Sequence, residues 1–217
     1  MICGVDEAGR GPVLGPMVVA AVMVESDSLL REMRVRDSKK LSPKRREELS
    51  TEIEKVAVIE LAIIPAEEID EMRGHMSLNE FEARVFASLI DRLRPDEAYV
   101  DAADVDEERF RDMIRSNLSY VPDLFCCHRA DDTYPVVSAA SIIAKTRRDR
   151  IVADIQKEIE EPIGSGYASD PVTIAFLERW LRKNKDYPPH TRKSWATARK
   201  ALVLARNSRL TDWSDEE

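Results

Sequence analysis

Short apolar runs recur along the chain, and polar start signals mark helices between them. Residues 2–6, 17–24, 56–64, 97–101 and 124–128 have the length and apolar content of covered strands. The first three strands follow one another early in the chain, and the later ones alternate with helical segments. This order predicts one mixed sheet, antiparallel at its start and continued by parallel strand–helix units.

Helices are predicted where a capping residue precedes apolar positions at helical spacing. Ser77 and Glu80 form an S-x-x-E capping box before the periodic residues 78–93. Ser42-Pro43 and Asp170-Pro171 each place a cap before a proline at the first helical position. Further helices are predicted over residues 66–72, 106–118, 138–159 and 194–204.

These elements predict an α/β fold, a five-stranded mixed sheet flanked by helices, with a helical C-terminal lobe. The expected domains are residues 1–161, which contain the sheet, and residues 162–217, which form a lobe with a basic surface and an acidic tail. A chain of 217 residues with 43 % hydrophobic residues is large enough for such a core.

Cysteine use and hydropathy exclude several classes of protein. The three cysteines are odd in number and show no C-x-x-C spacing, so neither a disulfide framework nor a structural zinc site is supported. The first charged residue comes at position 6, which argues against a signal peptide, and no apolar run approaches the ~18–20 residues that span a bilayer. These features predict a cytoplasmic protein without a membrane partner.

The charge is unevenly distributed. A formal net charge of −8 speaks against nucleic-acid binding. However, residues 182–209 contain nine Lys/Arg and one acid, and residues 31–46 contain eight Lys/Arg and two acids. Such local basic surfaces can still hold phosphates, because salt screens distant charge. Solvated helix faces are the simpler interpretation of composition alone.

Four carboxylates stand at or just after predicted strands: Asp6, Glu7, Asp101 and Asp131. Sites in α/β sheets form at strand ends, and several buried carboxylates together require a cation. Oxygen ligands suit Mg²⁺ or Mn²⁺, and two such ions about 3.5–4 Å apart serve phosphodiester cleavage. Neighbouring residues of a regular strand point to opposite faces, so Asp6 and Glu7 share a site only if the strand bends or ends there. Ordinary turn formers and helix caps are the alternative for each acid taken singly.

Taken together, five segments resemble ribonuclease HII, the type 2 ribonuclease H family, and most closely its archaeal branch. They are Gly4-Val-Asp-Glu-Ala-Gly-Arg-Gly-Pro, Asp37-Ser-Lys-Lys-Leu, Tyr99-Val-Asp, Arg129-Ala-Asp with Tyr134-Pro-Val-Val-Ser-Ala-Ala-Ser-Ile-Ile-Ala-Lys, and Gly164-Ser-Gly-Tyr-Ala-Ser-Asp-Pro. Their order along residues 2–200 makes the resemblance specific. It implies a ribonuclease H-like fold and an endonuclease that hydrolyses the RNA strand of RNA–DNA hybrids.

The same resemblance implies a two-metal mechanism that also cuts 5′ of single ribonucleotides in duplex DNA and leaves 3′-hydroxyl and 5′-phosphate ends. Such an enzyme supports ribonucleotide removal in DNA replication and repair. Asp6, Glu7, Asp101 and Asp131 are then the catalytic and metal-binding acids, with Asp132 as the rival for the last position.

The resemblance also implies substrate contacts. Backbone groups of Gly9, Arg10 and Gly11 would test for the ribose 2′-hydroxyl, and Tyr167 would stack on the neighbouring deoxyribose. The remaining candidates are expected at the phosphate backbone: Lys39, Ser138, Ser141, Lys145 and Arg192. Flexible turns, helix caps and solvated surface charges are the structural alternatives for these residues.

At the C-terminus, residues 207–213 resemble in part a sliding-clamp peptide, but the usual glutamine and paired aromatics are missing. An acidic tail without fixed structure is the better-supported interpretation, so any clamp contact is expected to be weak. The family resemblance also suggests a monomer.

Two other functions remain open. A nucleic-acid-binding protein without catalysis would bind duplexes in a salt-dependent manner and ignore the 2′-hydroxyl. Another metal nuclease on the same fold would cut DNA structures or long hybrids only. The four acids disfavour the first alternative, and the glycine segment with Tyr167 disfavours the second.

Overall fold

The computed structural model describes residues 1–35 and 41–211, and side chains as far as residue 206. Contacts divide the chain into two compact units. Unit 1 comprises Met1–Ala8, Met17–Ile63 and Met76–Asp149, and unit 2 comprises Gly9–Pro16, Ile64–His75 and the chain from Arg150 onward. The units follow contacts and not chain order, so the expected domain boundary after residue 161 stays a prediction.

A mixed sheet forms the centre of unit 1. Among the described residues its strands are β1 (Ile2–Ala8), β2 (Met17–Val24), β3 (Val58–Ile64), β4 (Glu97–Asp101) and β5 (Asp123–Cys127), in the order β3-β2-β1-β4-β5. β1 pairs antiparallel with β2 and parallel with β4, and β4 pairs parallel with β5. The predicted α/β fold with a mixed five-stranded sheet is confirmed.

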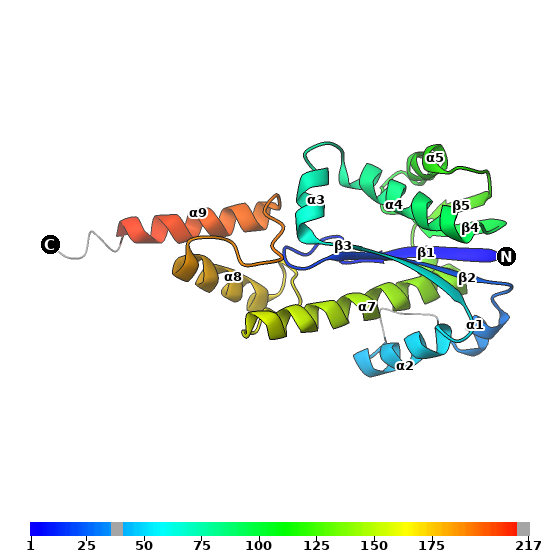
Figure 1. The fold of residues 1–217 in the computed structure, drawn as a ribbon, viewed down its shortest axis with the longest axis horizontal. Coiled ribbons are helices and arrows are strands. Elements are labelled where there is room, and N and C mark those ends of the chain that lie inside the picture. The colour runs from blue at the N-terminus through cyan, green and yellow to red at the C-terminus, as the bar shows by residue number, and fades with distance from the viewer. Residues whose placement is uncertain (36–40, 212–217) are drawn as a thin grey trace. The chain divides into compact units, whose positions relative to one another are not determined.

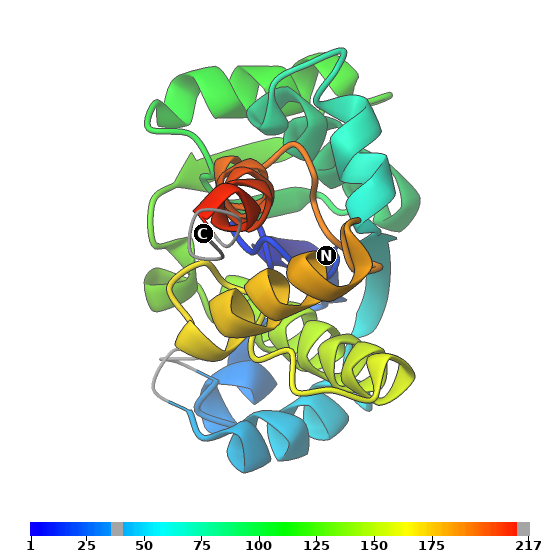
Figure 2. The same cartoon turned by 90° about the vertical axis from the view of Figure 1, so that its left-hand side faces the viewer.

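Helices cover both faces of this sheet. α4 (Leu78–Leu93) and α5 (Glu107–Asn117) lie on one face (Figure 1). α1 (Ser28–Glu32), α2 (Pro43–Ile53) and the first part of α7 (Pro135–Ile159) lie on the other. Figure 2, turned by 90°, keeps α4 and the α1–α2 pair on opposite sides. Both faces are therefore shielded, which explains why all eight residues of β2 are apolar and all but one are buried.

Local signals set several helix ends. Ser77 accepts a hydrogen bond from Glu80 N while the Glu80 carboxylate accepts one from Ser77 N, so the predicted capping box is confirmed. Asp170 caps α8 (Pro171–Asn184), also as predicted. Two short helices were not anticipated, α1 and α6 (Ala130–Thr133), because segments of about one turn carry too few periodic positions to be recognised.

Unit 2 has its own apolar core. α8 and α9 (Ala196–Thr211) pack around buried residues from several segments, namely Val13, Leu14, Ile155, Ile163, Phe176, Leu177, Leu181, Ala198, Ala201 and Ala205. α3 (Ala66–Met72) belongs to the same unit. The early segment Gly9–Pro16 therefore folds with the C-terminal helices and not with the strands that flank it in sequence. None of the described helices has the length and apolarity that crossing a bilayer requires.

Candidate active site

Three of the four predicted acids meet in unit 1. Asp6, Asp101 and Asp131 each offer a carboxylate oxygen, and these oxygens lie within 4.8 Å of one another. Asp6 and Asp131 are buried, with exposed fractions of 5 % and 3 %, and Asp101 is half-buried. Such a group of hard oxygen donors is a suitable ligand set for a divalent cation.

The register of the sheet explains this meeting. β1 and β4 are neighbouring parallel strands with Val5 opposite Val100, so Asp6 and Asp101 are the next residues along each strand. Asp131 enters from α6, four residues beyond the end of β5, which pairs with β4. The Ala130 amide donates to Asp101 Oδ1 at 3.1 Å, which ties the start of α6 to the end of β4.

Gly4 allows a helix to approach the acidic cluster. A Cβ at this position would lie 2.3 Å from the backbone C and O of Val136, so only glycine admits the first turn of α7. Gly4 and Asp6 are two residues apart and therefore face the same side of β1. Ser141, five residues after Val136, hydrogen-bonds Asp6 on that side. Gly4 thus sets the distance between β1 and α7.

The groups around Asp6 make its charged form unfavourable when no cation is bound. Burial, followed by the charges of Glu7 and Asp101, raises the pKa of Asp6 well above its ordinary value. The hydrogen bond from Ser141 and the charge of Lys145 act in the opposite direction. A divalent ion among the three carboxylates would stabilise their charged forms, so the residues present fit such an ion.

Glu7 is not one of the three acids whose carboxylate oxygens lie within 4.8 Å of one another. The expected strand end at residue 6 was wrong, because β1 continues to Ala8 and both acids lie within it, Asp6 opposite Ala20 and Glu7 opposite Val19. Glu7 is only partly buried, and its backbone amide donates to Asp6 Oδ1 at 2.8 Å. Its charge reaches Asp6, as the raised pKa shows, but its metal ligation stays a prediction.

Asp131 and Asp132 differ clearly in their surroundings. Asp131 is buried within the cluster, and its backbone oxygen accepts a hydrogen bond from Ser138 Oγ. Asp132 is exposed, and its carboxylate lies 3.4 Å from Arg129 Nε. The cluster thus contains the acid that was preferred from sequence.

The residues predicted at the phosphate backbone occupy different environments. Ser138 and Ser141 are fully buried, and Lys145 Nζ donates to Ser141 Oγ at 2.8 Å. In this structure these residues support Asp6 and Asp131, which corrects the expectation that the two serine hydroxyls face a phosphate. Lys145 is partly exposed, so a phosphate contact by its ammonium stays a prediction. Lys39 lies outside the described residues.

Unit 2 holds the predicted ribose-reading residues. Gly9 is buried with φ of +82°, Arg10 is partly buried, and Gly11 is exposed. The carbonyl of Gly166 accepts hydrogen bonds from the amides of Val13 and Leu14 at 2.8 and 3.1 Å. The next residue, Tyr167, is 38 % exposed. The glycine segment and the tyrosine loop are therefore joined by backbone hydrogen bonds.

Arg192 corrects one prediction directly. Its side chain is 0 % exposed, and its guanidinium donates to the carbonyls of Gly9, Arg10 and Gly15. A side chain so placed does not grip DNA. Sequence analysis missed this role, and it also missed Trp195, whose indole Nε1 donates to the Gly11 carbonyl at 3.2 Å. The only sequence signal was a tryptophan within a basic segment.

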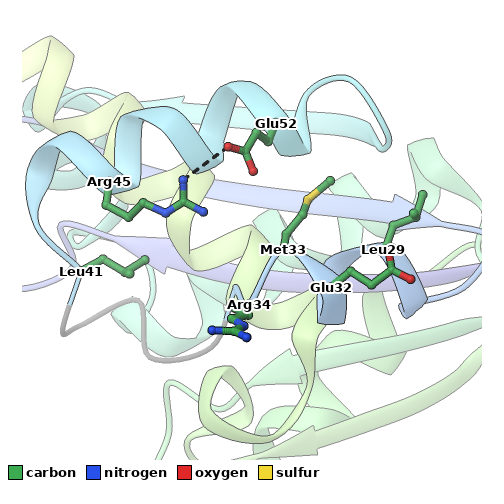
Figure 3. A pocket seen from close by; sticks show the side chains of 7 residues that line it. All are labelled: Leu29, Glu32, Met33, Arg34, Leu41, Arg45 and Glu52. Carbon is green, nitrogen blue, oxygen red and sulfur yellow. Dashed lines mark hydrogen bonds and ion pairs between the residues drawn. The ribbon is translucent and has the colours of Figure 1, made fainter.

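A depression elsewhere in unit 1 lacks these features. It has a volume of about 650 Å³ and is lined from α1, α2 and the residues between them: Leu29, Glu32, Met33, Arg34, Leu41, Arg45 and Glu52 (Figure 3). Arg45 Nη1 and Glu52 Oε1, both on α2, pair at 3.3 Å (Figure 3). Among the described residues that line the depression, none is a predicted site residue, so cavity size alone does not locate the chemistry.

Known proteins resemble this chain over nearly all its length. Residues 3–198 match the family model described as Ribonuclease HII. A ribonuclease HII of Thermococcus kodakarensis is 51 % identical over 207 residues, covering 92 % of this chain and 88 % of that protein.

Solved structures show the same relationship. A ribonuclease H2 from Pyrococcus horikoshii has a TM-score of 0.88 and 41 % identity, covering 94 % of this chain and 98 % of the other. The ribonuclease HII in a complex with PCNA from Archaeoglobus fulgidus has a TM-score of 0.86 and 40 % identity, covering 93 % and 96 %. The predicted family and ribonuclease H fold are thereby confirmed. The chain belongs to the ribonuclease HII family, metal-dependent endoribonucleases that cleave the RNA strand of RNA–DNA hybrids.

Proposed function

We propose that this protein cuts on the 5′ side of a ribonucleotide, including a single ribonucleotide embedded in duplex DNA. The products are a 3′-hydroxyl and a 5′-phosphate end. The observation that carries the proposal is the group of Asp6, Asp101 and Asp131 carboxylates within 4.8 Å on strands β1 and β4 and helix α6. It supports phosphodiester hydrolysis because that reaction requires charge stabilisation at the attacking and leaving oxygens.

The proposed cofactor is Mg²⁺ or Mn²⁺, with two ions during catalysis. Such ions supply an activated water and a Lewis acid at the leaving oxygen when bound. Asp6, Asp101 and Asp131 would hold them, with Glu7 as the fourth carboxylate. Ser141 and Lys145 keep Asp6 oriented and partly offset its burial, and the Ala130 amide keeps Asp101 oriented. The acids are thus held in place before the substrate arrives.

Recognition of the ribonucleotide is assigned to unit 2. The exposed Gly11 and the partly buried Arg10 offer backbone to a sugar, and Tyr167 offers an aromatic ring for stacking. The 2′-hydroxyl distinguishes ribose from deoxyribose at a given position, so a backbone donor or acceptor placed against it selects RNA. We propose on this basis that the protein removes ribonucleotides from DNA during replication and repair, in the cytoplasm.

A sliding clamp is proposed as a protein partner. The support is the relative from Archaeoglobus fulgidus, which is 40 % identical and was solved in a PCNA:RNase HII complex. The residues in question here, 207–213, lie where side chains are not described. The protein itself is proposed to act as a monomer.

The decisive assay uses a DNA duplex with one ribonucleotide, incubated with purified protein and Mg²⁺ or Mn²⁺. Cleavage 5′ of the ribonucleotide is expected, and an all-RNA strand in a hybrid should also be cut. An uncut single-ribonucleotide duplex beside a cut hybrid would support a nuclease for long hybrids only. Salt-dependent binding without cleavage of either substrate would support a binding protein instead.

Tyr167→Ala tests the reading of the junction. It should lower cleavage of the single-ribonucleotide duplex by about 10-fold, which corresponds to ~1.4 kcal/mol of lost contact with the sugar. Cleavage of the all-RNA strand should fall less, because each of its nucleotides carries a 2′-hydroxyl. Equal losses on both substrates would refute junction reading by Tyr167.

A further inference from the structure

Arg192 is a buried cation whose guanidinium donates four hydrogen bonds to main-chain carbonyls. Its Nη1 donates to the Arg10 carbonyl at 2.7 Å, and its Nη2 donates to the carbonyls of Gly9 at 2.5 Å and Gly15 at 3.0 Å. Nε donates to Gly15 as well, at 3.1 Å. An arginine fork has the rigid, planar donors that such a set of acceptors requires.

Backbone hydrogen bonds fix the position of Arg192 relative to the segment Gly9–Pro16. The amide of Arg192 donates to the Val13 carbonyl at 2.9 Å, and the amide of Gly15 donates to the His190 carbonyl at 2.9 Å. Trp195 adds its indole bond to the Gly11 carbonyl and lies with its ring 5.0 Å from Arg192 Cζ. The carbonyls of Gly9, Arg10 and Gly11 therefore all point toward these two side chains.

Asp70 of α3 holds the two residues that follow Arg192. The Asp70 carboxylate accepts hydrogen bonds from the backbone amides of Lys193 and Ser194 at 2.6 and 3.0 Å, and from Ser194 Oγ at 2.5 Å. These bonds fix the residues that follow Arg192. The position of the guanidinium is thus set by the fold before any nucleic acid binds.

Peptide geometry gives this arrangement a consequence. In a trans peptide the carbonyl and the N–H point in opposite directions. Because the carbonyls of Gly9 and Arg10 point toward the guanidinium, the amides of Arg10 and Gly11 point away from it. Two successive donors on the outer side of the segment suit the oxygen of a ribose 2′-hydroxyl.

We infer that Arg192 is a positioning residue for ribonucleotide recognition: it holds the carbonyls of Gly9 and Arg10 inward, so that the amides of Arg10 and Gly11 face the 2′-hydroxyl. This inference rests on the proposed function of the glycine segment. It differs from a phosphate contact, because Arg192 acts on the protein backbone and the charge never meets the nucleic acid. It also differs from a purely structural role, because its loss should affect ribose more than deoxyribose.

The test measures binding in an Asp101→Asn background, which removes cleavage. Dissociation constants are compared for a duplex with one ribonucleotide and for the same duplex as all-DNA. The parent should prefer the ribonucleotide. In Arg192→Lys and Arg192→Ala the ratio of the two dissociation constants should fall toward 1. Binding of the all-DNA duplex and its salt dependence should stay unchanged. With the wild-type acids restored, kcat/KM on the single-ribonucleotide duplex should fall by about 100-fold.

Lys193→Ala is the matched control, because Lys193 is the adjacent cation and its side chain is exposed. It should weaken binding of both duplexes equally or not at all, so the ratio of the two dissociation constants should equal that of the parent. Millimolar guanidinium chloride should partly restore the preference in Arg192→Ala by filling the vacated site, and the same concentration of urea should not. Trp195→Phe, which removes the indole N–H and reduces the ring but keeps an aromatic side chain, should lower the preference by a smaller factor. It also tests the inference should Arg192→Ala fail to fold.

The outcomes separate the inference from the proposed function. A parent without preference for the ribonucleotide would overturn 2′-hydroxyl reading by the glycine segment, and the inference with it. If the parent prefers the ribonucleotide and both Arg192→Lys and Trp195→Phe keep that preference, the inference about Arg192 is overturned and the proposed function is not. If Arg192→Lys binds the all-DNA duplex more weakly and its affinity depends less on salt concentration, Arg192 contacts a phosphate. That result would also overturn the inference.

Discussion

The two units each bury charge, but they compensate it differently. In unit 1 the carboxylates of Asp6, Asp101 and Asp131 lie together, and burial, followed by the charges of Glu7 and Asp101, raises the pKa of Asp6. In unit 2 the single cation of Arg192 is surrounded by carbonyls of the chain itself. The acidic cluster is only partly offset by Ser141 and Lys145, whereas the arginine is satisfied by the fold.

This difference in how the charges are compensated indicates different roles for the acidic cluster and for Arg192. A cluster with excess like charge gains stability when a cation from solution binds, so its chemistry depends on that ion. A cation already bonded to carbonyls gains nothing from an external ligand, and instead shapes the backbone that holds it. The comparison therefore predicts opposite responses of the two regions to mutation and to metal.

The largest effect is expected from Asp101→Asn. The amide keeps the volume of the side chain but removes one negative charge from the proposed metal site, so cleavage should fall by roughly 10³-fold. Duplex binding should remain, because the basic surfaces are untouched. Single-turnover cleavage and fluorescence anisotropy measure the two quantities. Loss of the folded state in circular dichroism would show instead that Asp101 is structural.

Gly4→Ala and Gly11→Ala compare glycines of the two units. A Cβ at Gly4 would collide with the backbone of α7, whereas one at Gly11 meets nothing within 4 Å. Gly4→Ala should therefore destabilise the protein by about 3 kcal/mol, measured by urea unfolding. Gly11→Ala should leave stability within about 0.5 kcal/mol and lower ribonucleotide preference. Equal stability of the two variants would contradict the close approach of α7 to β1.

Asp6→Asn tests the excess charge of the acidic cluster. A raised carboxyl pKa contributes stability at acidic pH that is lost as pH rises through the pKa of the folded state. Without divalent ions at pH 7, the variant should thus be more stable than wild type by ~0.5–2 kcal/mol. The advantage should shrink toward pH 4.

Adding Mg²⁺ should then raise the melting temperature of wild type more than that of Asp6→Asn. Differential scanning calorimetry with and without chelator provides the measurement. An equal shift in both proteins would place the stabilising ion away from Asp6.

The smallest effect is expected at Asp170, which holds the loop before α8. Hydrogen bonds from Ser165 and from the Val172 amide lower the pKa of Asp170 to about 2. A lowered pKa contributes stability above the unfolded value of ~3.9, and this is lost as pH falls through the folded value. Asp170→Asn should lower the melting temperature by a few degrees at pH 6, and by less near pH 2.

Asp154→Asn, at an exposed carboxylate of the same unit, serves as the control for Asp170→Asn. It should leave the melting temperature nearly unchanged across this range. A difference at Asp170 that persists undiminished at pH 2 would contradict the proposed cause.

Sequence alone determined the strands, the main helix caps, the mixed sheet and the family. Periodicity and capping are local properties, so residues close in the chain are enough to specify them. The capping box at Ser77 and the cap at Asp170 illustrate this. The acids could also be selected as candidates, because the parallel neighbours β1 and β4 bring Asp6 and Asp101 together, and Asp131 from α6 meets them.

Only the tertiary structure decided how far the strand of Asp6 and Glu7 extends, which of two adjacent aspartates is buried, and what Arg192 contacts. Each depends on atoms distant in the chain: Asp6 on the register with β2 and β4, and Arg192 on carbonyls more than 170 positions earlier. An arginine in a basic segment has the same sequence signature whether it faces phosphate or backbone. Burial distinguishes the two, and burial is a property of the folded chain.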